Sequence, residues 1–200
     1  MVDNYFSRHN LFETPNIERI PKYRLIFVSG AFGDGKTLFL TNYAVENKNS
    51  YKKIYANYHI KKIKNFQYLK KVDKKTLFNL KPESLLVLQE SYHYFDKRDC
   101  MKKANKEIVH ALFQIRKLKI DIVADIPKLS YIDFRWGESA TDFFKAYGEL
   151  YEDLFLYARM VNVNKDFRIP IFEPVQKFFI NAKNVYQYYD TFEKTYTGNG

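Results

Sequence analysis

The sequence has almost no cysteine and no long apolar segment, and each absence excludes a class of protein. The single cysteine, Cys100, excludes an intrachain disulfide and any cysteine cluster that binds zinc or iron–sulfur. No apolar run approaches the roughly 18 residues that cross a bilayer, and residues 1–10 are polar rather than typical of a signal peptide. We therefore expect a soluble protein without a membrane span. The four histidines lack the spacing of metal ligands (His9, His59, His93 and His110).

Acidic side chains are fewer than basic ones. The chain has 33 Lys and Arg against 23 Asp and Glu, a net charge of +10, which favours a polyanionic partner. Lysine is densest in one stretch, which either follows a nucleic-acid backbone or forms a solvated helix face. Its members are Lys61, Lys62, Lys64, Lys70, Lys71, Lys74 and Lys75. Aromatic residues are spread along every segment, so we assign them to core packing rather than to stacking on bases.

A complete phosphate-binding motif lies near the N-terminus. Residues 30–37 read Gly-Ala-Phe-Gly-Asp-Gly-Lys-Thr, the pattern G-x-x-x-x-G-K-T. Residues 23–29 before it are typical of a buried strand, and Lys36–Val45 has apolar residues at helical spacing. A strand, a glycine loop and a helix therefore follow in order. The alternative is a glycine-rich turn before an ordinary helix.

The loop chemistry suits a nucleoside triphosphate. Glycines let the backbone wrap around a polyphosphate, the helix N-terminus supplies partial positive charge, and Lys36 adds a full charge. We expect Thr37 to hold Mg²⁺ through its hydroxyl. The predicted nucleotide-binding residues are Gly30, Ala31, Phe32, Gly33, Asp34, Gly35, Lys36, Thr37 and Leu38.

A polar pair follows the most apolar predicted strand. The second predicted strand is Lys53–His59, and we expect one or two short helices in the lysine-rich stretch after it. The third, Ser84–Glu90, is continuously apolar and so central in a parallel sheet. Ligands bind at the carboxyl ends of such strands, which places Gln89 and Glu90 beside the phosphate loop. We assign Glu90 to activation of the attacking water; the alternatives are the water shell of Mg²⁺ or a residue that faces solvent.

Later segments continue the α/β pattern. Met101–Leu118 has the spacing of an amphipathic helix and leads into a fourth strand, Ile120–Asp125. In P-loop proteins with an extra strand, that strand lies between the loop strand and the acidic strand, so Asp125 would face the γ-phosphate. A fifth strand is predicted over Leu154–Val163 and a further β element over residues 167–179, where prolines indicate an edge or a turn.

The domain organisation follows from the length of the chain and from the positions of its prolines. Two hundred residues, 46% of them hydrophobic, suit a single three-layer α/β unit. Residues 1–21 contain two prolines and little periodicity, so we expect an N-terminal arm there and one P-loop ATPase domain over residues 22–200.

These segments, in this order, resemble the zonular-occludens-toxin-like ATPases of viruses, phages and mobile elements, a branch of the FtsK–HerA-like P-loop ATPases. The resemblance spans roughly residues 23–193. It is carried by the phosphate loop and then by residues 54–60, 86–90 with 94–98, 114–117 before 121–123, 132–135 and 189–193. It implies an α/β, three-layer P-loop NTPase with a mostly parallel central sheet of the additional-strand type.

Two positions depart from the pattern of that family. Its acidic strand usually ends in Asp-Glu, whereas Gln89 stands at the Asp position here. An amide accepts a hydrogen bond from a magnesium-bound water but brings no charge, so the affinity for Mg²⁺ should fall. The fourth strand usually ends in Gln, whereas this chain has Asp125. Either Asp125 restores the charge missing at Gln89, or the chain is a degenerate enzyme with slow turnover.

The resemblance implies an ATP-driven motor that moves DNA during viral or mobile-element genome packaging, assembly or extrusion. Lys36 would hold the phosphates, Thr37 and, through water, Gln89 would organise Mg²⁺, and Glu90 would activate the attacking water. Arg116 and Arg135 are candidates for an arginine donated across a subunit interface, or else surface ion-pair partners.

The expected partners are DNA, further copies of the chain in a ring, and viral structural or assembly proteins. The expected location is the host-cell cytoplasm or the virion. Two other classes remain open. One is a small P-loop kinase, although the sequence has no evident Arg-rich lid; the other is a nucleotide-binding scaffold with little or no turnover, which Gln89 would favour.

Overall fold

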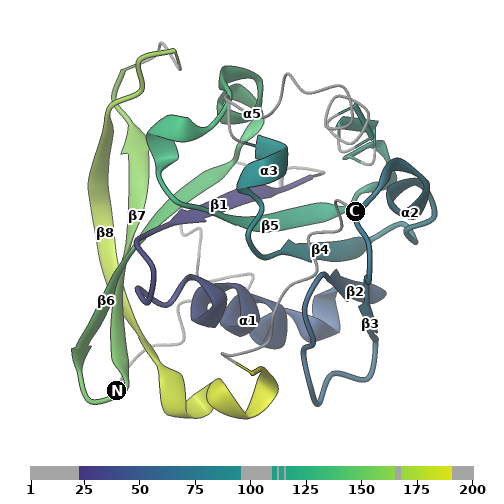
Figure 1. The fold of residues 1–200 in the computed structure, drawn as a ribbon, viewed down its shortest axis with the longest axis horizontal. Coiled ribbons are helices and arrows are strands. Elements are labelled where there is room, and N and C mark those ends of the chain that lie inside the picture. The colour runs from purple at the N-terminus through teal and green to yellow at the C-terminus, as the bar shows by residue number, and fades with distance from the viewer. Residues whose placement is uncertain (1–22, 96–109, 112, 115, 165–167, 191–200) are drawn as a thin grey trace, which may run out of the picture.

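Eight strands form one continuous sheet in the order β3-β2-β4-β5-β1-β6-β7-β8 (Figure 1). The structure is a computed structural model that describes residues 23–95, 110–111, 113–114, 116–164 and 168–190. The predicted N-terminal arm and most of the helix predicted over residues 101–118 lie outside the described residues. No described helix is long and apolar enough to span a membrane.

The centre of the sheet consists of parallel, fully buried strands. β1 (Leu25–Ser29), β4 (Ser84–Leu88) and β5 (Asp121–Ile126) are buried at every position, as their continuous apolar sequences predict. β5 pairs with β1 on one side and with β4 on the other. The extra strand therefore lies where the sequence predicted it, and the additional-strand arrangement is confirmed.

Side chains alternate between the two faces of the sheet and meet a different layer on each. On one face, Ile26 and Val28 of β1 pack against α1 (Lys36–Glu46). On the other, Leu25 and Phe27 join a cluster that includes Trp136 of α5 (Phe134–Ser139), with α3 (Tyr92–Phe95) packed against it. The result is a three-layer arrangement with the sheet in the middle (Figure 1).

The lysine-rich stretch differs from the prediction. Where one or two helices were expected, β3 (Phe66–Tyr68) pairs in parallel with β2 (Lys53–Ala56) at the sheet edge. Three residues are too few to show the alternation of a strand, so the apolar spacing suggested a helix instead. A short helix, α2 (Lys74–Phe78), does follow, because the Asp73 carboxylate accepts a hydrogen bond from the Thr76 amide and caps its first turn.

An antiparallel extension completes the other end of the sheet. No strand was predicted over β6 (Asp142–Tyr151), because Lys145 and Glu149 interrupt its apolar residues. It pairs in parallel with β1 and antiparallel with β7 (Leu154–Asn162), the predicted fifth strand. β8 (Phe172–Asn181) forms the edge and contains Pro174, which an edge strand tolerates.

The segment after β8 returns beneath α1 (Figure 1). Val185 and Tyr189 join the buried cluster on the α1 face of the sheet. The amide of Lys61 donates a hydrogen bond to the carbonyl of Tyr188 at 2.6 Å. The end of the described chain is therefore tied to the loop that follows β2, at the other end of the sheet.

Candidate nucleotide-binding site

The phosphate-binding loop turns sharply between β1 and α1. Gly33 and Gly35 have φ angles of 86° and 87°, a left-handed conformation that favours glycine. The amide of Ala31 donates to the Asp34 carboxylate at 2.6 Å, which closes the loop from within. Phe32, at its tip, is fully exposed. The loop leads directly into the first amides of α1, which have no partner inside the helix and present partial positive charge.

Lys36 lies across the loop. Its ammonium group donates to the carbonyl of Gly30 at 3.0 Å and to that of Ala31 at 2.8 Å. Both acceptors are neutral, whereas a phosphate would offer charged oxygens and a stronger, charge-assisted hydrogen bond. A phosphate would therefore be a stronger acceptor for the Lys36 ammonium group than these two carbonyls are.

The hairpin of β6 and β7 presses against the loop at two points. A Cβ atom at Gly30 would lie 3.1 Å from the Cβ of Ala146, and one at Gly35 would lie 2.6 Å from the hydroxyl of Tyr157. That hydroxyl donates a hydrogen bond to the carbonyl of Gly35 at 2.7 Å. Glycine at position 35 is thus required by its φ angle and also by the contact with β7.

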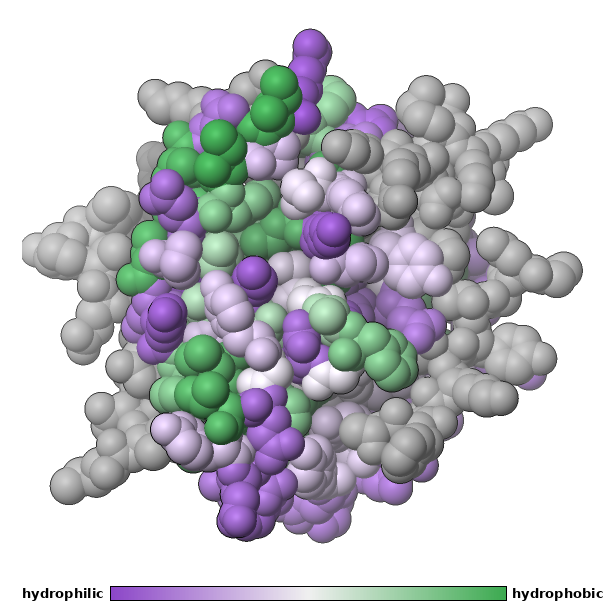
Figure 2. Space-filling view, turned by 60° about the vertical axis from the view of Figure 1, so that its left-hand side comes forward, coloured by the Kyte–Doolittle hydropathy of each residue, from purple (hydrophilic) through white to green (hydrophobic). Residues whose placement is uncertain are grey.

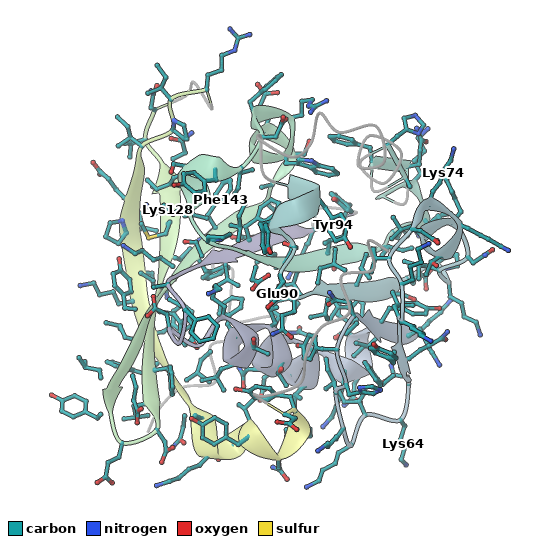
Figure 3. All side chains as sticks on the ribbon, viewed as in Figure 1. Lys64, Lys74, Glu90, Tyr94, Lys128 and Phe143 are labelled. Carbon is teal, nitrogen blue, oxygen red and sulfur yellow. The ribbon has the colours of Figure 1, made fainter. Side chains whose placement is uncertain are left out.

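The tip of β4 is held by its neighbour β2. The side chain of Asn57 donates to the carbonyl of Gln89 and accepts from the amide of Gln89, both at 2.8 Å. Glu90, the next residue, has a φ angle of 52°, a costly conformation for a residue with a side chain. Glu90 is exposed and lies between the end of β4 and α1 (Figure 3).

Asp125 lies among the proposed catalytic groups. Its side chain is buried and accepts a hydrogen bond from the amide of Ser91 at 3.0 Å. Burial raises its pKa to about 6; the amides of Ser91 and Glu90 and the charge of Lys36 lower that pKa, and the charge of Glu90 raises it. Asp125 is therefore within electrostatic reach of Lys36 and of Glu90.

Two oxygen donors suit a magnesium ion with its water shell. Within the described part of the chain, neither the hydroxyl of Thr37 nor the side-chain amide of Gln89 forms a hydrogen bond to the protein. Hard oxygen donors are what Mg²⁺ prefers, and it retains several waters. The described residues contain no group of three or more His, Cys, Asp or Glu side chains that could hold a metal. These residues fit Mg²⁺ held partly by a phosphate rather than a cage made by the protein alone.

Of the two candidate arginines, only Arg135 has a side chain that the structure describes. The backbone of Arg116 lies in a 3₁₀ turn, Arg116–Leu118, but its side chain lies outside the described structure. Arg135 forms two hydrogen bonds with the carboxylate of Asp133, at 2.7 and 2.9 Å. Leu38 is buried in the core, so only its backbone faces the site.

Two residues near the site, Tyr157 and Ser91, were not predicted from the sequence, and a third, Asn57, was given no task there. Tyr157 and Ser91 carry no local signal, because their partners, Gly35 and Asp125, are distant in the chain. Asn57 lies within residues 54–60, which carry part of the family resemblance, and its contact with Gln89 shows its structural task.

Comparisons with known proteins give a fold and no sequence family. No protein-family model matches the sequence, and no curated protein is significantly similar to it. The N-terminal domain of zonular occludens toxin from Neisseria meningitidis aligns with a TM-score of 0.56 at 17% identity, over 84% of this chain and 99% of that domain. This likeness confirms the predicted resemblance at the level of the fold, that of a P-loop NTPase.

Two viral proteins align less closely. The DNA-packaging ATPase B204 of Sulfolobus turreted icosahedral virus has a TM-score of 0.48 at 14% identity, over 78% of this chain and 99% of its own. The genome-packaging NTPase B204 of Sulfolobus turreted icosahedral virus 2, in complex with ATP-γS, has a TM-score of 0.49 at 11% identity, over 78% of this chain and 100% of its own.

We predict that Asp125→Asn stabilises the protein increasingly as the pH rises from about 4 to 7. A folded-state pKa of about 6, above the ordinary value of 3.8, means that ionisation of Asp125 opposes folding. The contribution of Asp125 to the free energy of unfolding is fully favourable below the pKa of the unfolded state and is lost as the pH rises through the pKa of the folded state. The gain of the variant over the parent should grow by up to about 3 kcal/mol. Urea unfolding at several pH values measures it.

Asp73→Asn is the matched control with the opposite sign. The amide of Thr76 holds the pKa of Asp73 below its usual value, so this variant should lose stability relative to the parent as the pH rises. A difference between Asp125→Asn and parent that does not change with pH would contradict the assignment.

Proposed function

We propose that the chain is an ATP-hydrolysing motor that moves DNA during viral or mobile-element genome packaging, assembly or extrusion. The observation that carries the proposal is the convergence of Lys36, Glu90 and Asp125 where β1, β4 and β5 end, beside a complete phosphate loop. A cation for the phosphates and a carboxylate for the water are the two groups that phosphoryl transfer to water needs.

Each residue of the site has a proposed task. The loop amides and Lys36 bind the β- and γ-phosphates. Thr37 and, through water, Gln89 would hold Mg²⁺, which would neutralise charge that develops on the phosphates. Glu90 accepts a proton from the attacking water, and its exposed position at the end of β4 leaves room for that water. That Asp125 supplies the negative charge missing at Gln89 stays a prediction.

A second copy of the chain is the proposed source of an arginine that reaches the γ-phosphate. Arg135 is already paired with Asp133, so an arginine that reaches the γ-phosphate would have to leave that pair or come from a neighbour. Exposed apolar side chains recur along β6–β8 and the adjoining loops, where Figure 2 shows several apolar groups among polar side chains; this part of the surface is called here the apolar margin. They are Tyr147, Leu150, Tyr151, Val161, Val163, Ile169, Ile171, Val175 and Phe179. Such a surface on a globular protein favours an interface.

The position of the apolar margin supports a ring in which nucleotide lies between subunits. The hairpin that carries part of it touches the loop at Gly30 and Gly35. A neighbour seated there would lie beside the bound phosphates, where an arginine donated in trans must reach. We place residues 22–200 in one ATPase domain within such a ring, preceded by an arm, in the host-cell cytoplasm or the virion.

A nucleotide-binding scaffold with little turnover is the competing function, favoured by the uncharged Gln89 and by the hydrogen bonds that occupy Asp125. Phosphate release by the purified protein with ATP and Mg²⁺, with and without DNA, separates the two. A small P-loop kinase would instead require an acceptor nucleotide.

We predict that Lys36→Ala abolishes turnover and weakens ATP binding about 10- to 100-fold, since it removes one charge-assisted hydrogen bond to phosphate. Equilibrium titration with a fluorescent ATP analogue measures the binding. Lys177→Ala, which removes an exposed lysine from β8, is the control and should bind like the parent. Unchanged turnover in Lys36→Ala would rule out the phosphate-loop assignment.

Glu90→Gln should separate binding from hydrolysis. It keeps the shape and hydrogen-bonding capacity of the side chain but removes the base, so kcat should fall by about 10²- to 10⁴-fold. ATP affinity should stay at the parental value. The control, Glu46→Gln, changes the same charge at the exposed end of α1. If Glu90→Gln hydrolyses ATP at the parental rate, Glu90 is not the base and Asp125 becomes the first candidate.

DNA binding is proposed for the edge of the sheet formed by β3. The seven lysines between Lys61 and Lys75, called here the lysine edge, are all exposed, while buried Ile63, Leu69 and Val72 hold this segment on the sheet. Lys64 and Lys74 point outward on this side (Figure 3). Between residues 60 and 82 the only carboxylate is that of Asp73. Within the described structure Lys64, Lys70 and Lys75 form no ion pair.

We predict that replacing Lys64, Lys70 and Lys75 with alanine weakens DNA binding and flattens its dependence on salt. Each DNA phosphate that a lysine no longer neutralises reduces the slope of log K against log salt by about 0.7 to 0.9, hence by about 2 to 3 in total. Fluorescence anisotropy with single-stranded and duplex DNA measures the slope. The control removes Lys128, Lys177 and Lys183, three exposed lysines elsewhere. Equal slopes in both variants would contradict DNA binding by the lysine edge. These lysines would then serve only to keep the edge strand β3 from pairing with strands of other chains.

A further inference from the structure

The hydroxyl of Tyr157 reaches the phosphate loop from outside the strand–loop–helix motif. Tyr157 lies in β7, an antiparallel strand two places from β1 in the sheet. It is fully buried, and its hydroxyl donates to the carbonyl of Gly35 at 2.7 Å. The same carbonyl accepts the amide of Phe39 at 3.0 Å, the first hydrogen bond of α1. Two donors thus occupy both lone pairs of one carbonyl.

Those two hydrogen bonds fix the direction of the next amide. In a planar trans peptide the C=O and N–H groups point in opposite directions. Because the carbonyl of Gly35 is held toward Tyr157 and the body of α1, the amide of Lys36 points the other way, into the loop. Lys36 is the first residue of α1, so its amide has no acceptor within the helix and is one of the groups that bind phosphate.

The ring of Tyr157 is itself held firmly. It packs against Phe39 of α1 at a centroid distance of 5.5 Å and stacks on Phe178 of β8 at 5.7 Å. Burial raises the pKa of Tyr157 well above its usual value, so the hydroxyl keeps its proton and remains a donor. A Cβ atom at Gly35 would lie 2.6 Å from that hydroxyl, so the loop has no room to move toward β7.

We propose that Tyr157 is a positioning residue for the phosphate site: its hydroxyl orients the Gly35–Lys36 peptide so that the amide of Lys36 faces a bound β-phosphate. The inference rests on the proposed nucleotide binding. It adds a residue of the antiparallel extension to a site otherwise built from parallel strands and α1.

The test compares Tyr157→Phe with Tyr58→Phe. Tyr58 is buried in the same cluster, and its hydroxyl is hydrogen-bonded to Thr41 of α1 at 3.0 Å, so both variants lose one buried hydroxyl that contacts this helix or its first turn. Affinities for ATP, ADP and AMP are measured at a temperature at which circular dichroism shows both variants fully folded. Under that condition a general loss of stability does not alter the dissociation constants.

Tyr157→Phe should lose about tenfold in affinity for ATP and ADP, the equivalent of one hydrogen bond, and less for AMP, which lacks the β-phosphate. Tyr58→Phe should bind all three like the parent. If both variants bind like the parent, or if Tyr157→Phe loses equal affinity for all three nucleotides, the positioning role is wrong. A parent that binds no nucleotide would instead overturn the proposed function itself.

An isosteric pair keeps the test valid if Tyr157→Phe does not fold. Position 157 is replaced by 4-aminophenylalanine, which retains a donor, and by 4-fluorophenylalanine, which has a similar size but cannot donate. The amino variant should restore the preference for ADP over AMP, and the fluoro variant should not. Equal preferences in the two variants would overturn the proposal.

Discussion

The close approach of the loop backbone to the β6–β7 hairpin is the constraint on which the site depends. At Gly30 and Gly35 even one additional carbon atom would press into Ala146 or Tyr157. The conformation of the loop is therefore set by tertiary packing as well as by its glycine φ angles. Since β6 pairs directly with β1, the strand that leads into the loop, loop and hairpin belong to one rigid part of the sheet.

The carboxyl ends of β4 and β5 carry a local electrostatic cost. At neutral pH Asp125 is buried and largely ionised, and the carboxylate of Glu90 lies near it. The cost of this buried negative charge is partly offset by hydrogen bonds from backbone amides and by the charge of Lys36. Glu90 adds backbone strain at a φ angle of 52°. Costs of this kind collect at functional sites, because a group that is fully satisfied in the fold has little left to offer a ligand. The amides of Ser91 and Glu90 would hold Asp125 even when Lys36 turns toward a phosphate.

The sequence predicts what local patterns encode and misses what distant contacts create. The loop, α1 and the buried strands β1, β4 and β5 were predicted because a motif and continuous apolar runs specify them within a few residues. β3 was missed because three residues carry no period, and β6 because a bulge between Ala146 and Gly148 and interspersed charges hide its alternation. Of the candidate site, the loop residues, Gln89, Glu90 and Asp125 could be named from the sequence. Tyr157 could not, since its partner Gly35 is 122 positions away.

The sheet also separates the two surfaces that a DNA motor would need. The lysine edge lies at β3, at one end of the strand order, and the apolar margin lies at β6–β8, at the other. The candidate site lies between them, and hydrogen bonds tie it in both directions. Asn57 joins the tip of β4 to β2, the neighbour of β3, while Tyr157 joins the loop to β7. The hydrogen bonds at Gln89 and Gly35 therefore join the candidate site to the strands that lead to each of these surfaces.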